Sequence, residues 1–207
     1  MSLATPLSAS RLRIVAAVLS VAAILATLDT TFAEDDVTVR YTALDLDGCQ
    51  ERTVDADGRG ASLRCEGLPG IPVLVSEGDL RFDVDFGLDD GRSDTFGPFN
   101  SPGETVEWRL ADGVPFAAIL RFRIEDPEGG LRDNRAGSVL GIFRVGRQGT
   151  PGCPVAYVDA TLNADANLVA RQAADGFGRD FRCGIDRAIY LGRTGPLSGN
   201  ATATYAE

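Results

Sequence analysis

The four cysteines, Cys49, Cys65, Cys153 and Cys183, are the residues of this chain best suited to chemistry. A zinc site needs closely spaced cysteines or histidines, and a reactive thiol needs a neighbouring base. The chain offers neither. Four cysteines allow three disulfide pairings. We predict the bridges Cys49–Cys65 and Cys153–Cys183, because each of these pairs closes a short local loop. A disulfide that closes a loop of about 15 residues stabilises a fold by ~3 kcal/mol.

Histidine and lysine are absent, so all 20 basic residues are arginine. This composition excludes Ser-His-Asp and Cys-His triads, histidine-ligated metals and histidine pH switches. It also excludes Ser-Lys dyads, Schiff-base chemistry and lysine-bound PLP. An enzyme would have to use carboxylates, hydroxyls, tyrosine or arginine. We predict no catalytic residue and no cofactor.

Residues 1–33 are typical of a secretory signal peptide. Arg11 and Arg13 precede the apolar run Ile14 to Leu28, and Thr31 and Ala33 offer small side chains at the cleavage point. The alternative, an uncleaved membrane anchor, needs ~20 apolar residues, and this run has 15. We therefore predict export to the periplasm, where disulfides persist, with no membrane association after cleavage.

The mature chain is strongly acidic. Removing residues 1–33 deletes Arg11, Arg13 and Asp29, which leaves 18 arginines against 29 acids and a net charge of −11. Nucleic acids and anionic membranes attract positive patches, so neither is an expected partner. The charge favours a basic periplasmic protein or a divalent cation as partner, or it serves solubility alone.

Acidic pairs precede glycines at three places: Asp45/Asp47, Asp55/Asp57 and Asp89/Asp90. An EF-hand needs acids at positions 1, 3 and 5, glycine at 6 and glutamate at 12. With Gly48 or Gly58 at position 6, position 1 would be Ala43 or Thr53, so both alignments fail. Asp-Gly pairs form turns, and we predict no metal site.

Alternating apolar and polar residues predict that most of the chain forms strands, at 37–46, 71–76, 79–86, 104–110, 116–125, 138–145 and 154–161. In 79–86 the residues expected to face inward are Leu80, Phe82, Val84 and Phe86. Asp112-Gly113 predicts a hairpin that joins 104–110 to 116–125.

One helix is expected over 164–174. Asn163 would be its N-cap, Leu168 and Val169 would face the core, and Gly176 would end it. Residues 195–207 contain few apolar side chains, so we expect them to fray as a flexible tail. Together, the predicted strands, helix and disulfides indicate one mainly β domain over 34–194. We expect an antiparallel β-sandwich or open barrel with a C-terminal surface helix and two local disulfides.

Charged side chains alternate with the apolar ones on three strands and define a candidate recognition face, composed of Arg81, Asp83, Asp85, Glu107, Arg109, Arg121, Arg123 and Glu125. Arginine forks suit carboxylates and phosphates, which makes Arg109, Arg121 and Arg123 candidate binding residues. The alternative is a solvated charge ladder, in which each pair of opposite charges contributes about 0.2–1 kcal/mol.

The long connection 87–104 is the second candidate for recognition. A structureless loop of this length is uncommon and often binds a partner. Phe96 and Phe99 are candidate anchors unless they fold back onto the core, and Asp89, Asp90 and Arg92 lie beside them.

Five segments resemble a family of small exported proteins of Gram-negative bacteria: YTALDLDGCQ, SLRCEGLPGIPVLVSEGDLRFDVDFG, FGPFNSPGETVEWRL, PFAAILRFRIEDP and VGRQGTPGCPVAYVDATLNADANLVARQAADGFGRDFRCG. The similarity covers most of residues 41–184 and includes all four cysteines. It implies export and paired cysteines, and the family has no assigned activity from which catalytic residues could be carried over.

Two functional hypotheses follow from the sequence. The first is a non-catalytic periplasmic binding or interaction module that docks through 87–104 onto a basic partner such as a lysozyme. The second is a carboxylate-dependent hydrolase of cell-wall glycan, since a glycosidase needs only two acids at the right separation.

Overall fold

The computed structural model describes residues 36–54, 60–88, 91–126 and 136–204. The expected signal peptide, residues 1–33, lies outside these ranges. So do two of the acidic pairs, Asp55/Asp57 and Asp89/Asp90.

Twelve strands in the described residues form three sheets. The six-stranded sheet has the order β1 (Val37–Ala43), β7 (Asn100–Ala111), β8 (Val114–Glu125), β9 (Ala136–Arg144), β10 (Cys153–Asp159) and β11 (Ile189–Leu191). It is antiparallel except for the parallel pair β10–β11. The four-stranded antiparallel sheet has the order β2 (Gln50–Val54), β3 (Gly60–Leu68), β4 (Ile71–Gly78) and β5 (Arg81–Phe86). A two-stranded ribbon pairs β6 (Ser93–Phe96) with β12 (Ala201–Thr204).

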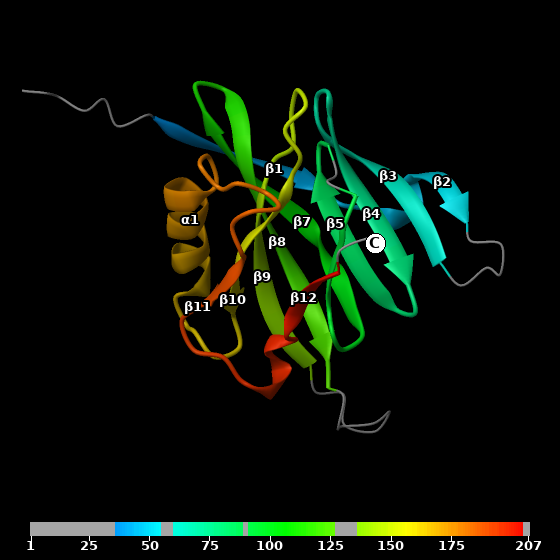
Figure 1. Cartoon of the computed structure of the whole chain (residues 1–207), viewed down its shortest axis with the longest axis vertical. Coiled ribbons are helices and arrows are strands. Elements are labelled where there is room, and N and C mark those ends of the chain that lie inside the picture. The colour runs from blue at the N-terminus through cyan, green and yellow to red at the C-terminus, as the bar shows by residue number, and fades with distance from the viewer. Residues whose placement is uncertain (1–35, 55–59, 89–90, 127–135, 205–207) are drawn as a thin grey trace, which may run out of the picture. The chain divides into compact units, whose positions relative to one another are not determined.

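The six-stranded sheet buries both of its faces. Toward the four-stranded sheet, Trp108 and Leu120 pack with Phe86 in the main core. On the opposite face, Ile119 and Ile142 pack against the helix α1 (Ala166–Phe177). Figure 1 shows the helix on one side of this sheet and β3, β4 and β5 on the other. The mainly β, sandwich-like architecture predicted from the alternating strands is therefore confirmed.

The predicted hairpin is present between β7 and β8. Asp112 and Gly113 both have positive φ, at 50° and 77°, and the flanking strands pair antiparallel from Ala111 and Val114 onward. Positive φ at both central positions is the geometry of the type I′ turn, which glycine adopts without steric cost.

Both predicted disulfides are confirmed. Cys49–Cys65 joins the turn after β1 to β3, and Cys153–Cys183 joins the start of β10 to the segment after α1. The loops close over sequence separations of 16 and 30. In the chain-entropy model each bridge contributes ~3–4 kcal/mol.

The helix differs from the one expected. It runs from Ala166 to Phe177, continues through Gly176, and has Asp165 rather than Asn163 at its N-cap. Its buried face consists of alanines; Val169 packs against the same core as predicted, whereas Leu168 is 56% exposed. Small side chains let the helix lie close to the sheet. The residues that face the core are therefore mainly alanines, and not the larger apolar residues from which the buried face was predicted.

The expectation of a frayed tail over 195–207 is wrong for the part that the structure describes. A 3₁₀ turn, η3 (Pro196–Ser198), precedes β12, which pairs with β6. The buried Asp159 carboxylate accepts hydrogen bonds from the Ser198 hydroxyl at 2.5 Å and from the Thr161 N–H at 2.8 Å. Tyr190 donates its hydroxyl proton to the Ser198 carbonyl at 2.6 Å. Hydrogen bonds to buried groups hold this segment, and a scarcity of apolar residues in the sequence does not reveal them.

Candidate functional site

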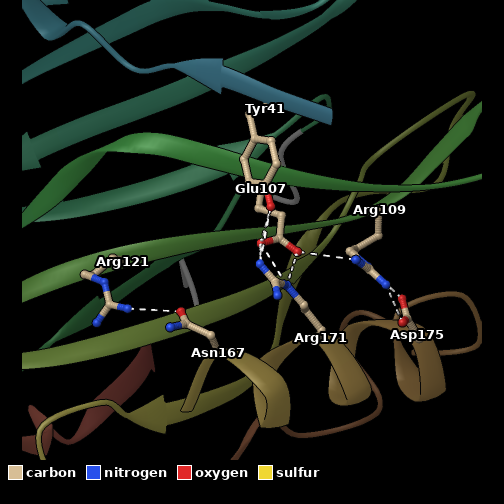
Figure 2. A network of polar contacts seen from close by, with 7 residues as sticks. All are labelled: Tyr41, Glu107, Arg109, Arg121, Asn167, Arg171 and Asp175. Atoms are coloured by element: carbon tan, nitrogen blue, oxygen red, sulfur yellow. Dashed lines mark hydrogen bonds and ion pairs between the residues drawn. The ribbon is translucent and has the colours of Figure 1, made fainter. Parts of the chain in front are cut away.

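The charged face expected on β7 and β8 largely lies beneath α1. Figure 2 shows Glu107 and Arg109 of β7 directed toward Arg171 and Asp175 of the helix. Arg109 donates to both carboxylate oxygens of Asp175 at 2.8 and 2.6 Å. Arg171 donates from Nε and Nη2 to Glu107, each at 2.8 Å. Both ion pairs are bidentate, which is the strongest arrangement available to an arginine.

This network attaches the helix to the sheet. The hydrogen bonds that Arg109 donates to Asp175 raise the pKa of Arg109 above its ordinary value, and those that Arg171 donates to Glu107 raise the pKa of Arg171 in the same way. Tyr41 adds a third donor to Glu107 at 3.2 Å. Because its partners are other side chains of the same fold, we assign the network to docking of the helix.

The three candidate arginines of this face therefore have different surroundings. Arg109 is 7% exposed and is occupied by Asp175. Arg121 donates to the Ser138 hydroxyl at 2.6 Å and to Asn167 of α1 at 3.1 Å. Arg123 is half exposed, with an ion pair to Glu125 at 2.9 Å.

A regular spacing in the sequence marks the helix side of the network. Asn167, Arg171 and Asp175 recur every four residues and so share one face of α1. They meet the arginines and the glutamate that alternate on β7 and β8 (Figure 2). This spacing is a signal in the sequence from which the polar stripe on the helix could be predicted.

Two acids expected on the solvent face of β5 are buried. Asp83 is 7% exposed and Asp85 is 8% exposed. The reason is β6, which runs beside β5: the Asp94 N–H donates to Asp83 at 3.1 Å, and the Thr95 hydroxyl donates to the Phe82 carbonyl at 2.8 Å. The alternation correctly predicts that Asp83 and Asp85 lie on the polar face of β5, but a neighbouring strand covers that face.

The long connection 87–104 contains β6 and the first residues of β7, and it separates the two candidate phenylalanines. Phe96 is 2% exposed and packs against the rings of Phe122 and Tyr157, with centroids 5.1 and 5.6 Å away. Phe99 is 43% exposed. Phe96 thus belongs to the core, and only Phe99 is available to a partner.

Phe99 lines a large groove beside the turn that joins β4 to β5. The groove encloses about 980 Å³, and its apolar wall consists of Leu80, Phe82, Pro98 and Phe99. Glu125 and Asp126, at the end of β8, supply its acidic wall. The alternation in 79–86 predicts that Leu80 faces the inside of the sandwich, but Leu80 is 60% exposed.

Leu80 is exposed because it forms the turn instead of entering the strand. Asp79 and Leu80 have φ of 53° and 58°, a conformation that a bulky side chain adopts only with strain. Glu77 accepts the Leu80 N–H at 2.7 Å, and the Leu80 carbonyl accepts the Asn100 N–H at 3.1 Å. These two bonds hold an apolar residue where a type I′ turn normally has glycine.

Asn100 organises the floor of the groove and is the main residue that sequence reasoning missed. It is 5% exposed, and its side-chain oxygen accepts the Phe82 N–H at 3.2 Å. Its amide group donates to Thr95 Oγ1 and to the Pro98 carbonyl, each at 3.3 Å. One side chain thus connects β5, β6 and the segment that carries Phe99. No local pattern in the sequence distinguishes such an asparagine from one in a turn.

Arg92 lies apart from the groove. It lines a polar pocket of about 160 Å³ together with Asp83 and Asp85, and also a second cavity beside the Cys153–Cys183 bridge. Asp89 and Asp90, the other candidates of this connection, fall outside the described residues.

The two acids that line the groove, Glu125 and Asp126, are consecutive in the chain, and Glu125 forms an ion pair with Arg123 at 2.9 Å. Within the described ranges, no group of three or more potential metal-ligating side chains comes together. No described helix is long and apolar enough to cross a membrane.

Comparisons of this chain with protein-family models, with curated proteins and with solved structures gave no match.

Proposed function

We propose that this protein is a non-catalytic binding module of the periplasm that holds a basic partner protein in the groove between Leu80 and Phe99. The observation that carries the proposal is the exposed pair itself. Leu80 and Phe99 are 60% and 43% exposed, and they line the same groove of about 980 Å³. Aromatic and aliphatic anchors that fill a complementary pocket supply most of the energy of a protein interface.

Backbone strain supports a functional reason for Leu80. A non-glycine residue in the left-handed region costs ~1–2 kcal/mol. Glycine at position 80 would complete the Asp-Gly sequence that this turn type favours and would remove that strain. Strained residues concentrate at binding sites, and here the strain holds a leucine side chain on the surface.

The rim is preorganised, which lowers the entropic cost of binding. Arg81 donates from Nε to the Gly97 carbonyl at 2.8 Å, and its guanidinium carbon lies 5.0 Å from the centre of the Phe99 ring. Asp79 forms an ion pair with the same guanidinium. The turn that carries Leu80 and the segment that carries Phe99 are therefore fixed before a partner arrives.

Charge favours a basic partner. The net charge predicted for the mature chain is −11, and Glu125 and Asp126 line the groove directly. Complementary charge accelerates encounter and selects among partners more than it adds affinity. A lysozyme is one basic protein of suitable chemistry. Export to the periplasm is part of the proposal, and the two disulfides are its structural support.

The alternative function, a carboxylate-dependent glycan hydrolase, has no such observation in its favour. That chemistry places two carboxyl groups about 5–9.5 Å apart on opposite sides of the bond that is cleaved. Glu125 and Asp126, the two acids that line the groove, are neighbours in the chain, and Glu125 is already paired with Arg123. Glu107 and Asp175 are committed to ion pairs with Arg171 and Arg109.

The experiment is affinity capture from the periplasm of the source bacterium with three forms of the tagged protein. The first is the wild type, and the second is the groove variant Leu80→Asp/Phe99→Ala. The third is a matched control, Leu168→Asp/Phe177→Ala, which changes the same residue types on α1, where they are 56% and 50% exposed. We expect a basic protein to be retained by the wild type and the control but lost from the groove variant. Equal retention by all three, or no retained protein, would contradict the proposal.

A further inference from the structure

We propose that the cavity beside the Cys153–Cys183 bridge is a second binding site, separate from the groove, which takes a free α-amino acid with an apolar side chain. The cavity encloses about 280 Å³ and shares no lining residue with the groove. Its charged residues are Arg92, Asp94, Asp186 and Arg187.

Two cations and two anions line this one small space, which matches a zwitterion. Arg187 is exposed and has no ion-pair partner within the described residues, so its guanidinium is available to an α-carboxylate. Arg92 enters from the segment before β6, and its Nη2 lies 2.7 Å from the position that a Cβ on Gly184 would occupy. Gly184 has a φ of 86°, and the missing side chain leaves room for that guanidinium.

The acidic residues suit an ammonium group. The Asp186 carboxylate accepts from Arg182 Nη2 at 2.7 Å and from the Arg182 N–H at 2.8 Å. These bonds lower the pKa of Asp186, so it stays ionised. Asp94 lines the cavity from β6. Ionised carboxylates can accept several hydrogen bonds, so partners within the protein do not exhaust them.

Size and apolar surface narrow the class of ligand. A volume of about 280 Å³ equals the liquid-phase share of roughly nine water molecules, and it lies just below the usual range for ligand pockets. A single amino acid fits this volume. Phe181, Pro154, Ala188 and Ala201 provide apolar surface for its side chain.

The disulfide Cys153–Cys183 holds one wall of this cavity in place. Cys153 lines the cavity from β10, and Cys183 begins the segment that carries Gly184, Asp186 and Arg187. The bridge therefore fixes the segment with Arg187 against the sheet. β12 closes another side through Ala201.

The test is titration calorimetry of the oxidised protein with L-leucine, N-acetyl-L-leucine and L-leucinamide. The two derivatives lack the ammonium and the carboxylate, respectively. We expect L-leucine to bind and each derivative to bind at least about tenfold more weakly. Arg187→Gln should weaken L-leucine binding at least about tenfold. Arg193→Gln, which removes an exposed arginine away from the cavity, should leave the affinity unchanged.

Three results would overturn the inference. One is an absence of binding heat with L-leucine at ~10 mM, which is about tenfold above a Kd of ~1 mM. Another is equal binding of N-acetyl-L-leucine, which would make the cavity a carboxylate site only. The last is unchanged L-leucine affinity in Arg187→Gln, with thermal unfolding of that variant used to verify its fold. None of these depends on the groove, so the two proposals fail or stand separately.

Discussion

The guanidinium carbon of Arg81 lies 5.0 Å from the centre of the Phe99 ring. The same side chain donates from Nε to the Gly97 carbonyl at 2.8 Å, so the β4–β5 turn is tied to the segment before β7. Residues 18 positions apart thereby form one rim, on which Leu80 and Phe99 are held apart from the core.

Leu80→Gly should stabilise the protein while it weakens partner binding. Relief of the left-handed strain should raise the free energy of unfolding by ~1–2 kcal/mol. The greater freedom of glycine in the unfolded chain should lower it by ~0.5–1 kcal/mol. The melting temperature should rise by about 2 °C, as measured by calorimetry. The reverse change in the other tight turn, Gly113→Leu (φ 77°), should lower it. A lower melting temperature for Leu80→Gly would show that the leucine side chain stabilises the fold.

Phe96→Ala and Phe99→Ala should differ sharply in stability. Phe96 is 2% exposed among aromatic neighbours, and truncation of such a ring costs ~3–5 kcal/mol. Phe99 is 43% exposed, so its truncation removes far less buried contact, of which the cation–π contact with Arg81 contributes ~0.5–1 kcal/mol. Urea denaturation of both variants measures the difference. Similar losses would mean that Phe99 is also a core residue.

Arg109→Ala should loosen α1 from the sheet. The substitution leaves the Asp175 carboxylate without its bidentate partner, at a cost of ~2–3 kcal/mol. Arg109→Lys should recover little, since an ammonium cannot reproduce the fork. Arg123→Ala removes a half-exposed ion pair and serves as the control, with a change within ~0.5 kcal/mol. Hydrogen exchange should be faster at the α1 amides in Arg109→Ala, and unchanged exchange there would contradict a docking role.

The unfolding free energy should fall as the pH rises above about 10, the ordinary pKa of tyrosine. Burial, with Asp94 nearby, raises the pKa of Tyr157 well above that value, and burial also raises the pKa of Tyr190. The folded chain therefore keeps phenolic protons that the unfolded chain loses, so stability is present below pH ~10 and is lost above it. Urea unfolding between pH ~8 and ~11 should show a shallower fall for Tyr157→Phe. An identical fall in that variant would exclude Tyr157 as the cause.

Local patterns predicted much of this fold. The alternation in β8 places Leu120, Phe122 and Ile124 in the main core, as predicted. The Asp112-Gly113 turn and both disulfides also follow from short-range features, because each connects residues that are near in sequence.

The predictions that were wrong concern residues whose partners lie far away in the sequence. Asp83 and Asp85 alternate correctly but are covered by β6, and β6 is itself paired with β12, more than 100 positions later. The groove has the same origin. Leu80 reads as a strand residue in isolation, and its carbonyl accepts the N–H of Asn100, 20 positions later, which helps to hold it in the turn. Pairing over such distances leaves no periodic trace in a single sequence.

The most direct test of the proposed function is the affinity of the captured partner for the wild type, the groove variant Leu80→Asp/Phe99→Ala and the α1 control Leu168→Asp/Phe177→Ala. The account predicts at least about a hundredfold weaker binding for the groove variant, which corresponds to ~2.7 kcal/mol and to the loss of two anchors. The control should match the wild type. Equal affinities for all three proteins, with thermal unfolding verifying that each is folded, would contradict the account.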